Sequence, residues 1–319
     1  MGIYLRDSEF VITFLNETPK MSSEENIPEA KTENQQPESD GKHFRHFGYE
    51  KKKPQFSSVE NSSKQSFRKK VWEYLEKNKL VNFPRPVFGR IPNFKGAEKA
   101  ATKLLELEEF KTAKSVEVNP DKPLEASRAL VVENDKILYV PVPQLQEGLL
   151  KKLSFCNDDK PKNIKQTVTR WGIETLGKNV EFGDELSIDL LVLGSVAVSR
   201  DGRRIGKGKG FADLEYAVLK EMKAVDDNTT IVTTVHDAQV CYVLRTSRFF
   251  ILTFQVFDTL PNDIFQKHDV PIDYILTPTQ IIKIEKKLPR PEGIYWDLLS
   301  QRQLNEMPIL QKIRDAQSR

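Results

Sequence analysis

Cysteine and histidine are scarce in this sequence, with two cysteines and four histidines among 319 residues. Cys156 and Cys241 lie far apart, and neither belongs to a paired spacing. Disulfide scaffolds and zinc sites need several such residues at short, defined intervals, so both are excluded as the organising feature of the chain. So few thiols are typical of a protein kept in a reducing compartment, and we predict a cytoplasmic location.

Long apolar runs and a large excess of one charge are also missing. Two apolar stretches, residues 10–15 and 249–257, fall well short of the roughly 20 residues that cross a bilayer, and the first lacks the features of a signal peptide. We therefore expect no membrane association. Lys and Arg total 49 against 46 Asp and Glu, a net charge of +3, which excludes a whole-surface nucleic-acid binder but allows a local basic patch.

The first 63 residues have the composition of a disordered tail. Residues 21–42 carry almost no large apolar side chains, so they cannot bury enough surface to offset the entropy of ordering. A basic and aromatic run follows at residues 43–53, for which contact with RNA or a membrane face is an alternative to the favoured interpretation of a solvated tail. We predict one folded, monomeric domain over residues 64–319.

Hydrophobic periodicity predicts alternating helices and strands from residue 64 onward. Phe67, Val71, Trp72 and Leu75 recur at helical spacing, and residues 187–198 form an apolar run typical of a central strand covered on both faces. This alternation predicts an α/β fold with a mostly parallel central sheet flanked by helices. We expect further helices at residues 96–110, 164–172, 212–224 and 296–314, and strands at 128–132, 136–142, 230–235 and 274–276.

The strongest chemical signal is a basic, glycine-rich run, Asp201-Gly-Arg-Arg-Ile-Gly-Lys-Gly-Lys-Gly-Phe-Ala-Asp213, between the apolar strand and a helix. Its last three glycines let the backbone approach a ligand, and the unpaired amides at a helix start favour an anion. Two arginines and two lysines add positive charge, so a polyphosphate is the ligand that this loop favours. The alternative is a flexible, solvated basic turn.

Three known motifs fit this loop poorly. A P-loop requires G-x-x-x-x-G-K-[ST], but Gly202 and Gly206 stand one residue too close, and Gly208 replaces the hydroxyl residue. In the dinucleotide motif G-x-G-x-x-G, the last glycine lies one residue later than Gly210 does here. An RNA-recognition motif would place Asp213 where an aromatic ring should stack on a base, so that interpretation is disfavoured.

The same run resembles the 5-formyltetrahydrofolate cyclo-ligase family, in which x-x-G-x-R-L-G-x-G-x-G-Y-Y-D follows a buried strand. The family's N-terminal K-x-x-x-R matches Lys64-Gln-Ser-Phe-Arg68, and its late-strand aspartate matches Asp273. The resemblance covers residues 64–279. It implies ATP-dependent ring closure of a folate-type substrate, 5-formyltetrahydrofolate, to 5,10-methenyltetrahydrofolate, with Mg²⁺ bound by Asp213 and Asp273.

The resemblance also assigns roles to other residues of this chain. It implies that Arg204 and Lys209 take part in catalysis, and that Phe211 and Ala212 contact the substrate. The implied ATP-binding residues include both ends of the N-terminal motif and most of the basic loop. They are Lys64, Arg68, Arg204, Gly206, Lys207, Gly208, Lys209 and Gly210.

Departures from the family pattern concentrate on the substrate side. Phe211-Ala212 replaces two tyrosines, and Ile91-Pro-Asn-Phe-Lys-Gly96 stands where the family's second helix presents methionine and glutamate to folate. Relatives pass almost directly from the preceding strand to a short acidic helix, so residues 241–255 are interpreted as an insertion, either a genuine β excursion or sequence from an imperfect gene model. Some members of the matching branch end in an RNA-recognition motif, which we expect to be absent because this chain stops at Arg319. Two functions stay open: a cyclo-ligase with slow turnover, or a non-catalytic nucleotide- or RNA-binding protein on the same fold.

Two histidine–aspartate pairs are further candidates for residues of a functional site. His236-Asp237 follows a predicted strand end, where sites of α/β proteins gather, but a capping or structural role is the preferred interpretation. His268-Asp269 is expected to be a solvated loop pair.

Overall fold

The structure, a computed structural model, describes residues 63–142, 148–155, 159–241 and 260–317. The predicted disordered tail, apart from Ser63, and the predicted insertion after Cys241 lie outside these described residues. All of the described residues belong to one unit of the fold, Ser58–Arg319. Within the described ranges, no helix combines the length and the apolar character needed to span a bilayer.

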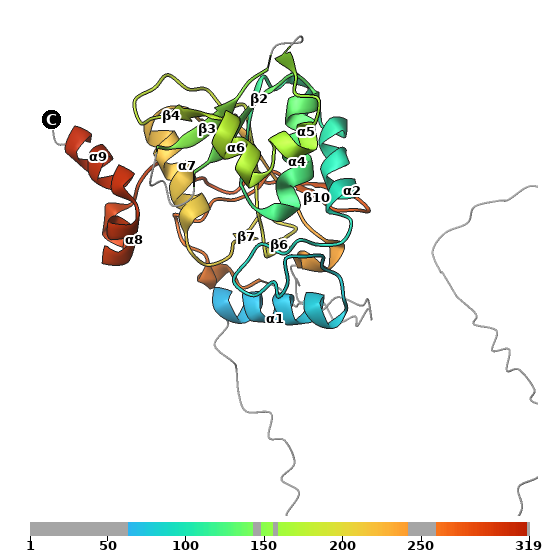
Figure 1. Cartoon of the computed structure of the whole chain (residues 1–319). Coiled ribbons are helices and arrows are strands. Elements are labelled where there is room, and N and C mark those ends of the chain that lie inside the picture. The colour runs from blue at the N-terminus through green and yellow to red at the C-terminus, as the bar shows by residue number, and fades with distance from the viewer. Residues whose placement is uncertain (1–62, 143–147, 156–158, 242–259, 318–319) are drawn as a thin grey trace, which may run out of the picture. The chain divides into compact units, whose positions relative to one another are not determined.

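The centre of the fold is a mixed sheet of eight strands in the order β11-β10-β8-β5-β1-β2-β3-β4. Strands β10, β8, β5, β1 and β2 run parallel to one another. At one edge β11 is antiparallel to β10, and at the other β3 is antiparallel to its neighbours β2 and β4, so β4 runs in the direction of the central strands. This arrangement confirms the predicted α/β class with a mostly parallel central sheet (Figure 1). The strands are β1 (Ser115–Val118), β2 (Ile137–Pro141), β3 (Leu150–Leu153), β4 (Lys178–Val180), β5 (Leu190–Leu193), β8 (Thr230–Thr234), β10 (Tyr274–Leu276) and β11 (Ile281–Lys283).

Strand β5 shows how the sheet divides the core. Leu191 and Leu193 pack in the same cluster as apolar side chains of helix α7 (Phe211–Glu221), whereas Leu190 and Val192 pack in the cluster that contains side chains of helix α4 (Glu125–Glu133). Successive side chains of a strand point to opposite faces of its sheet, so helices on both faces bury every residue of β5. The continuous apolar run in the sequence is explained by this double coverage.

The apolar run predicted as one strand at residues 187–198 is in fact two strands in different sheets. After β5 the chain turns at Gly194 and enters β6 (Ala197–Ser199), the middle strand of a small sheet ordered β7-β6-β9. A side chain at Gly194 would lie 2.9 Å from Cγ1 of Ile91, so the turn needs glycine. The other two strands are β7 (Arg204–Ile205) and β9 (Val240–Cys241).

Several predicted helices are present but interrupted. The helix predicted over residues 96–110 consists of two α-helical pieces joined by a 3-10 turn, and the predicted last helix breaks before Pro308, because proline disfavours helical backbone in the preceding residue. The helices are α1 (Lys64–Lys77), α2 (Ala97–Thr102), α3 (Glu108–Thr112), α4 (Glu125–Glu133), α5 (Ile164–Thr167), α6 (Arg170–Leu176), α7 (Phe211–Glu221), α8 (Gln301–Glu306) and α9 (Pro308–Gln317).

The segment predicted as a strand at residues 128–132 is instead part of helix α4, and β1 was not predicted. The apolar, β-branched residues at positions 128–132 favour a strand locally, but Arg128 is buried and is fixed by contacts with backbone outside α4. The guanidinium donates hydrogen bonds to the backbone oxygens of Asn119 (2.7 Å), Val168 (3.1 Å) and Asp121 (3.2 Å). These bonds and the packing of α4 against the sheet outweigh the weak local propensity.

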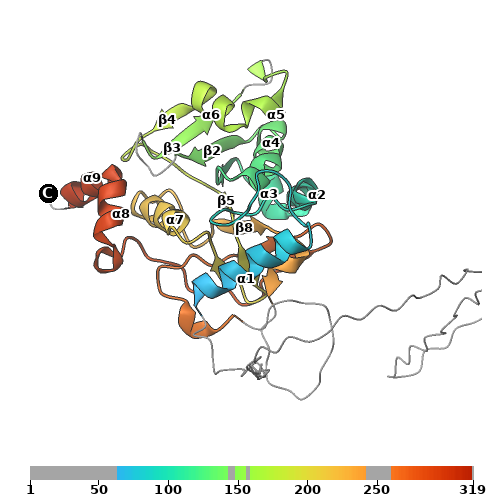
Figure 2. The same ribbon diagram turned by 60° about the horizontal axis from the view of Figure 1, so that its bottom comes forward.

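Helix α1 packs against the small sheet. Val71 shares an apolar cluster with Ala197 of β6 and Ile205 of β7. Figure 2 shows α1 in front of strands β5 and β8. This packing brings Lys64 and Arg68 beside the loop that joins β7 to α7.

Candidate active site

A cavity of about 710 Å³ lies at the carboxyl ends of β1 and β5. Asn119 directly follows β1 and Gly194 directly follows β5, so the two strand ends supply part of the wall. The remaining walls come from α1, the loop between β7 and α7, the first turns of α7, and α8. This is the edge of a parallel sheet where ligand sites gather, and the volume is in the range of small-molecule sites, about 300–1,000 Å³.

Every residue that the sequence predicted to bind ATP lines this cavity, as do the predicted substrate residues Phe211 and Ala212. The structure joins the two parts of the predicted phosphate site across 138 positions of the chain, because Arg68 Nε donates a hydrogen bond of 2.7 Å to the backbone oxygen of Gly206. The roles of these residues stay predictions, but their convergence on one cavity is a property of the fold.

The glycine loop adopts positive φ angles at Gly208 and Gly210, a conformation that glycine allows most readily. Gly208 has a φ of +93°, and a Cβ there would lie 3.0 Å from the guanidinium carbon of Arg68. Gly210 has a φ of +71° and is the N-cap of α7. Since no side chain caps α7, its first amides stay available to an anion in the cavity, and the helix dipole favours negative charge there.

Three of the five cationic side chains of the cavity are paired with aspartates that also line it. The pairs are Lys64–Asp269, Lys207–Asp121 (2.7 Å) and Arg204–Asp213. Arg68 and Lys209 make no ion pair among the described residues, and of these two Lys209 is the exposed one. Burial lowers the pKa of Arg68 from its ordinary value. Lys209 is therefore the exposed cation that meets an incoming anion without first losing a carboxylate partner.

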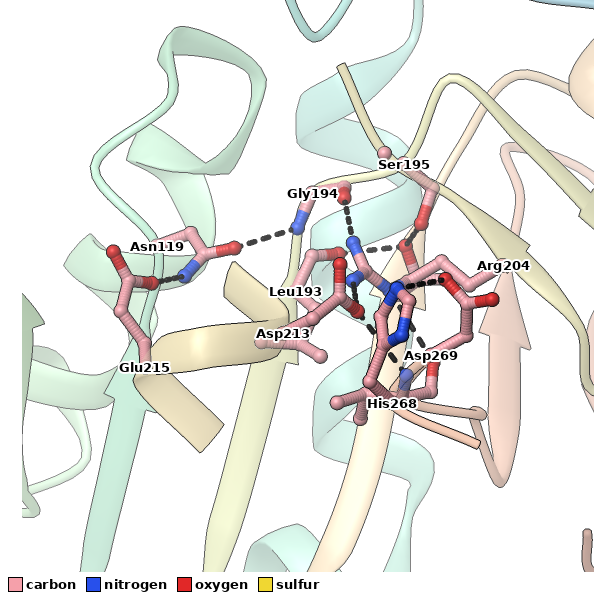
Figure 3. Close-up of polar contacts among 12 residues, drawn as sticks. Asn119, Leu193, Gly194, Ser195, Arg204, Asp213, Glu215, His268 and Asp269 are labelled. Carbon is pink, nitrogen blue, oxygen red and sulfur yellow. Dashed lines mark hydrogen bonds and ion pairs between the residues drawn. The ribbon is translucent and has the colours of Figure 1, made fainter. Parts of the chain in front are cut away.

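A chain of hydrogen bonds connects the cationic side of the cavity with its inner wall (Figure 3). Arg204 pairs with Asp213 and also donates to the backbone oxygen of Gly194 at 3.0 Å. The Gly194 amide donates to Asn119 Oδ1 at 3.0 Å, and Asn119 Nδ2 donates to Glu215 Oε2 at 3.4 Å. The turn after β5 thus holds both acidic residues near the start of α7 in fixed positions.

Two buried acids lie at the inner wall. Glu215 of α7 lines the cavity with 7% of its surface exposed, and Glu117 of β1 lies behind it, only 1% exposed. Burial raises the pKa of Glu215 to about 7. Burial and the charge of Glu215 raise the pKa of Glu117 well above its ordinary value. Asn119 lies between the two carboxyl groups and donates weakly to each, at 3.5 Å to Glu117 and 3.4 Å to Glu215.

The predicted metal ligands are not brought together at the cavity. Asp213 lines the cavity, but Asp273 is not part of its wall. The Asp273 carboxylate accepts from the Ile231 amide (2.8 Å) and from Arg290 (2.6 Å), and Lys287 lies 3.7 Å away. Within the described ranges, no group of three or more acidic, His or Cys side chains is arranged to hold a metal ion. Magnesium binding by this pair stays a prediction.

The sequence reasoning missed several residues of the cavity wall. Asp269 was expected to be solvated, but its side chain is only 13% exposed and is paired with Lys64, which corrects that expectation. His236, by contrast, has the predicted capping role, since its Nδ1 accepts from the Ala238 amide. The sequence did contain one signal for the inner wall, because Glu117 stands between two valines in the segment Ser115–Val118. The other missed wall residues are Asn119, Asp121, Glu215, Ser300, Gln303 and Glu306.

Comparisons with known proteins match the predicted resemblance. A methenyltetrahydrofolate synthase domain-containing protein of Danio rerio is 40% identical over 255 residues, which cover 80% of this chain and 62% of that protein. Its namesake in Homo sapiens is 40% identical over 252 residues, covering 79% and 61%. The chain therefore spans less than two thirds of the length of these relatives.

A solved structure and a family model also match this chain. An Aquifex aeolicus 5,10-methenyltetrahydrofolate synthetase, solved by NMR, aligns with 74% of this chain and 99% of its own, at 21% identity and a TM-score of 0.42. The 5-formyltetrahydrofolate cyclo-ligase family model matches residues 60–248, which include α1, the glycine loop and α7. The chain belongs to the 5-formyltetrahydrofolate cyclo-ligase family.

Proposed function

We propose that this chain binds ATP in the cavity and uses it to convert 5-formyltetrahydrofolate to 5,10-methenyltetrahydrofolate. The observation that carries the proposal is the convergence of five cationic side chains, from α1, from β7 and from the loop between β7 and α7, on one cavity. A polyphosphate is the ligand that suits such a cluster. Membership of the cyclo-ligase family supports the reaction class.

The chain's own residues contribute mainly positioning and charge neutralisation, which dominate catalysis of phosphoryl transfer. Arg68 and Lys209 hold phosphate oxygens, and the uncapped start of α7 directs amides at the same charge. Lys207 is paired with Asp121, so a bound phosphate competes with that carboxylate. Bound ATP supplies the phosphoryl group that makes the formyl oxygen a leaving group. The substrate's N10 then bonds to the formyl carbon, N10 loses its proton, and the oxygen departs as phosphate.

Magnesium fits this site only in part. Mg²⁺ is commonly bound by one or two carboxylates together with substrate phosphates and water, and Asp213 is placed to contribute one carboxylate. Asp213 is paired with Arg204, and Asp273 is held outside the cavity wall by Arg290. Only Asp213 of the predicted pair lines the cavity, so Mg²⁺ enters the proposal as the companion of ATP.

One observation favours the alternative of a nucleotide- or RNA-binding protein without turnover. Ala212 lines the cavity at a position where the family motif carries tyrosine, so an aromatic surface is missing from the substrate side. Ile91, also in the wall, begins the segment Ile91-Pro-Asn-Phe-Lys-Gly96, which stands where the family pattern presents methionine and glutamate to folate. Either change leaves the phosphate side of the cavity in place.

The proposal is tested by measuring nucleotide binding and turnover separately. ATP-Mg should raise the melting temperature of the purified chain, since a ligand that binds only the folded state stabilises it by mass action. Incubation with ATP-Mg and 5-formyltetrahydrofolate should release ADP and produce the methenyl product. Stabilisation by ATP without any ADP release would favour the binding protein, and the absence of stabilisation at millimolar ATP would contradict both the ATP-dependent enzyme and the nucleotide-binding protein.

A further inference from the structure

The inner wall of the cavity contains a hydrogen-bond acceptor that the protein itself leaves unused. Glu215 is 93% buried and lines the cavity, yet within the described ranges its carboxyl group accepts a single hydrogen bond, a long one of 3.4 Å from Asn119 to Oε2. Its Oε1 has no hydrogen-bond partner among those residues. Buried carboxyl groups are normally paired because an unpaired one is costly, so this arrangement points to a partner outside the chain.

The cations of the cavity do not supply that partner. The charges of Lys207 and Arg204 act on Glu215 and lower its pKa, but Lys207 is paired with Asp121 and Arg204 with Asp213. Glu117, on the other side of Asn119, is an acid and cannot neutralise Glu215. The inner wall therefore favours a ligand group that donates hydrogen bonds, in contrast to the phosphate side, which favours an acceptor.

The position of Glu215 is fixed by rigid elements. The residue lies in the second turn of α7, and Asn119 is held against β5 by bonds from its own amide to the Val192 carbonyl (3.1 Å) and from the Gly194 amide to Oδ1 (3.0 Å). Figure 3 shows Asn119 between Gly194 and Glu215. An acceptor held by a strand end and a helix loses little freedom when a ligand binds, which favours a specific, planar partner.

Apolar side chains line the same cavity. Ile91, Val142 and Phe211 all contribute to its wall, and Ile91 and Val142 are buried to more than 90%. A flat heterocycle needs such surfaces for its faces and polar groups for its edge. The cavity therefore offers an edge acceptor, apolar contacts and, at its other end, a phosphate site.

We propose that Glu215, positioned by Asn119, recognises the 2-amino-4-oxopyrimidine edge of a ligand ring through its adjacent N–H donors. A carboxylate accepts two parallel N–H bonds from such an edge in the same way as it does from a guanidinium. Two ligands share this edge, the pterin of a reduced folate and the guanine of a nucleotide. The inference rests on the proposed function for the pterin, and it adds the residue that selects the substrate ring.

The experiment compares ligands that differ only at that edge. Binding of 5-formyltetrahydrofolate to the full chain is measured by calorimetry beside an analogue in which hydrogen replaces the 2-amino group, and GTP is measured beside ATP. We expect the analogue to bind about tenfold or more weakly, the loss typical of a hydrogen bond to a charged group. In Glu215→Gln that difference should shrink to about twofold or less, whereas Glu117→Gln, which changes an acid outside the cavity wall, should retain it.

Each outcome has one meaning. Discrimination against the folate analogue assigns the pterin to Glu215, and a GTP preference that Glu215→Gln removes assigns guanine. Equal binding of ligand and analogue by the wild-type chain, together with equal binding of GTP and ATP, would overturn the proposal even if Glu215→Gln failed to fold. Stabilisation by ATP-Mg is recorded separately, so that its absence contradicts the proposed function and not the assignment of Glu215.

Discussion

The two ends of the cavity balance their charges in opposite ways. At the phosphate end, three cations are each paired with an aspartate, and a polyphosphate exchanges one anionic partner for another. At the inner end, Glu117 and Glu215 face one another across the Asn119 amide, and neither forms an ion pair with a described residue. The phosphate end is therefore suited to exchanging one anion for another. The inner end holds two acidic groups close together, which a ligand that donates hydrogen bonds would stabilise. Four changes test this contrast.

The largest effect is expected at Gly208, where the loop meets α1. In Gly208→Ala, the new Cβ would lie 3.0 Å from the Arg68 guanidinium at a φ of +93°, so Arg68 and the loop must both shift. We expect the ATP-Mg stabilisation to fall below detection in a thermal melt. Gly183→Ala is the matched control, because Gly183 has a φ of +104° with nothing within 4 Å, so it carries the backbone strain alone. Equal ATP responses in the two variants would contradict the assignment of the loop.

A smaller effect is expected from removing Lys209, the exposed one of the two cavity cations that make no ion pair among the described residues. Lys209→Ala should weaken ATP binding about 10- to 100-fold, the range of a hydrogen bond to a charged group, with little change in stability without ligand. Lys69→Ala serves as control, because Lys69 is exposed on α1 and does not line the cavity. An unchanged Kd for ATP in Lys209→Ala, measured by calorimetry, would remove Lys209 from the site.

The contrast between the two ends also explains what the sequence could predict. The phosphate end was readable because its residues are contiguous in the glycine loop or lie in one helical turn of α1. The inner end depends on the contact between Asn119 and Glu215, which spans 96 positions. That contact exists only because β1 lies beside β5, and β1 was not predicted. A local sequence pattern can reveal residues that act together within one segment. A contact between residues far apart in the chain can be recognised only when the order of strands in the sheet is known.

The same limit applies to the metal prediction. Asp273 was assigned to Mg²⁺ from a matching strand motif, and the motif is indeed strand β10 with its preceding residue. No local pattern indicated that Arg290, 17 positions later, folds back onto the Asp273 carboxylate. The α/β class was predictable for the opposite reason, since it depends on the alternation of elements and tolerates the misassigned segment at residues 128–132.

The substrate side offers a test by restoration. In the double variant Phe211→Tyr with Ala212→Tyr, we expect kcat/KM for 5-formyltetrahydrofolate to rise about 2- to 10-fold, because an aromatic contact contributes roughly 0.5–1.5 kcal/mol beyond its buried area. The Kd for ATP should stay close to the wild-type value, since the phosphate side is unchanged. A wild-type kcat already in the ordinary range, roughly 1–10³ s⁻¹, would contradict the expectation of a weakened substrate side.

The smallest effect is a pH dependence of stability that separates the inner acids from surface acids. Burial and Glu215 raise the pKa of Glu117 in the folded chain, so above its ordinary value of 4.5 the unfolded chain releases a proton that the folded chain keeps. Stability linked to Glu117 is therefore complete below that pH and is lost as pH rises through the folded-state pKa, by at most about 1.4 kcal/mol per pH unit. The amide of Glu117→Gln does not titrate, so this variant does not lose stability in that way as the pH rises.

The melting temperature of Glu117→Gln relative to wild type should consequently rise between pH 5 and pH 8. Each kcal/mol corresponds to roughly 2–4 °C for a domain of this size, so the increase should be readable in a series of thermal melts. Glu215 titrates in the same direction with a folded-state pKa of about 7, and it is present in both proteins, so its own contribution largely cancels in the difference. The exposed Glu185, changed to Gln, should show no such increase. A difference that is constant with pH would mean that Glu117 is ionised in the fold, and that the inner wall has a cationic partner after all.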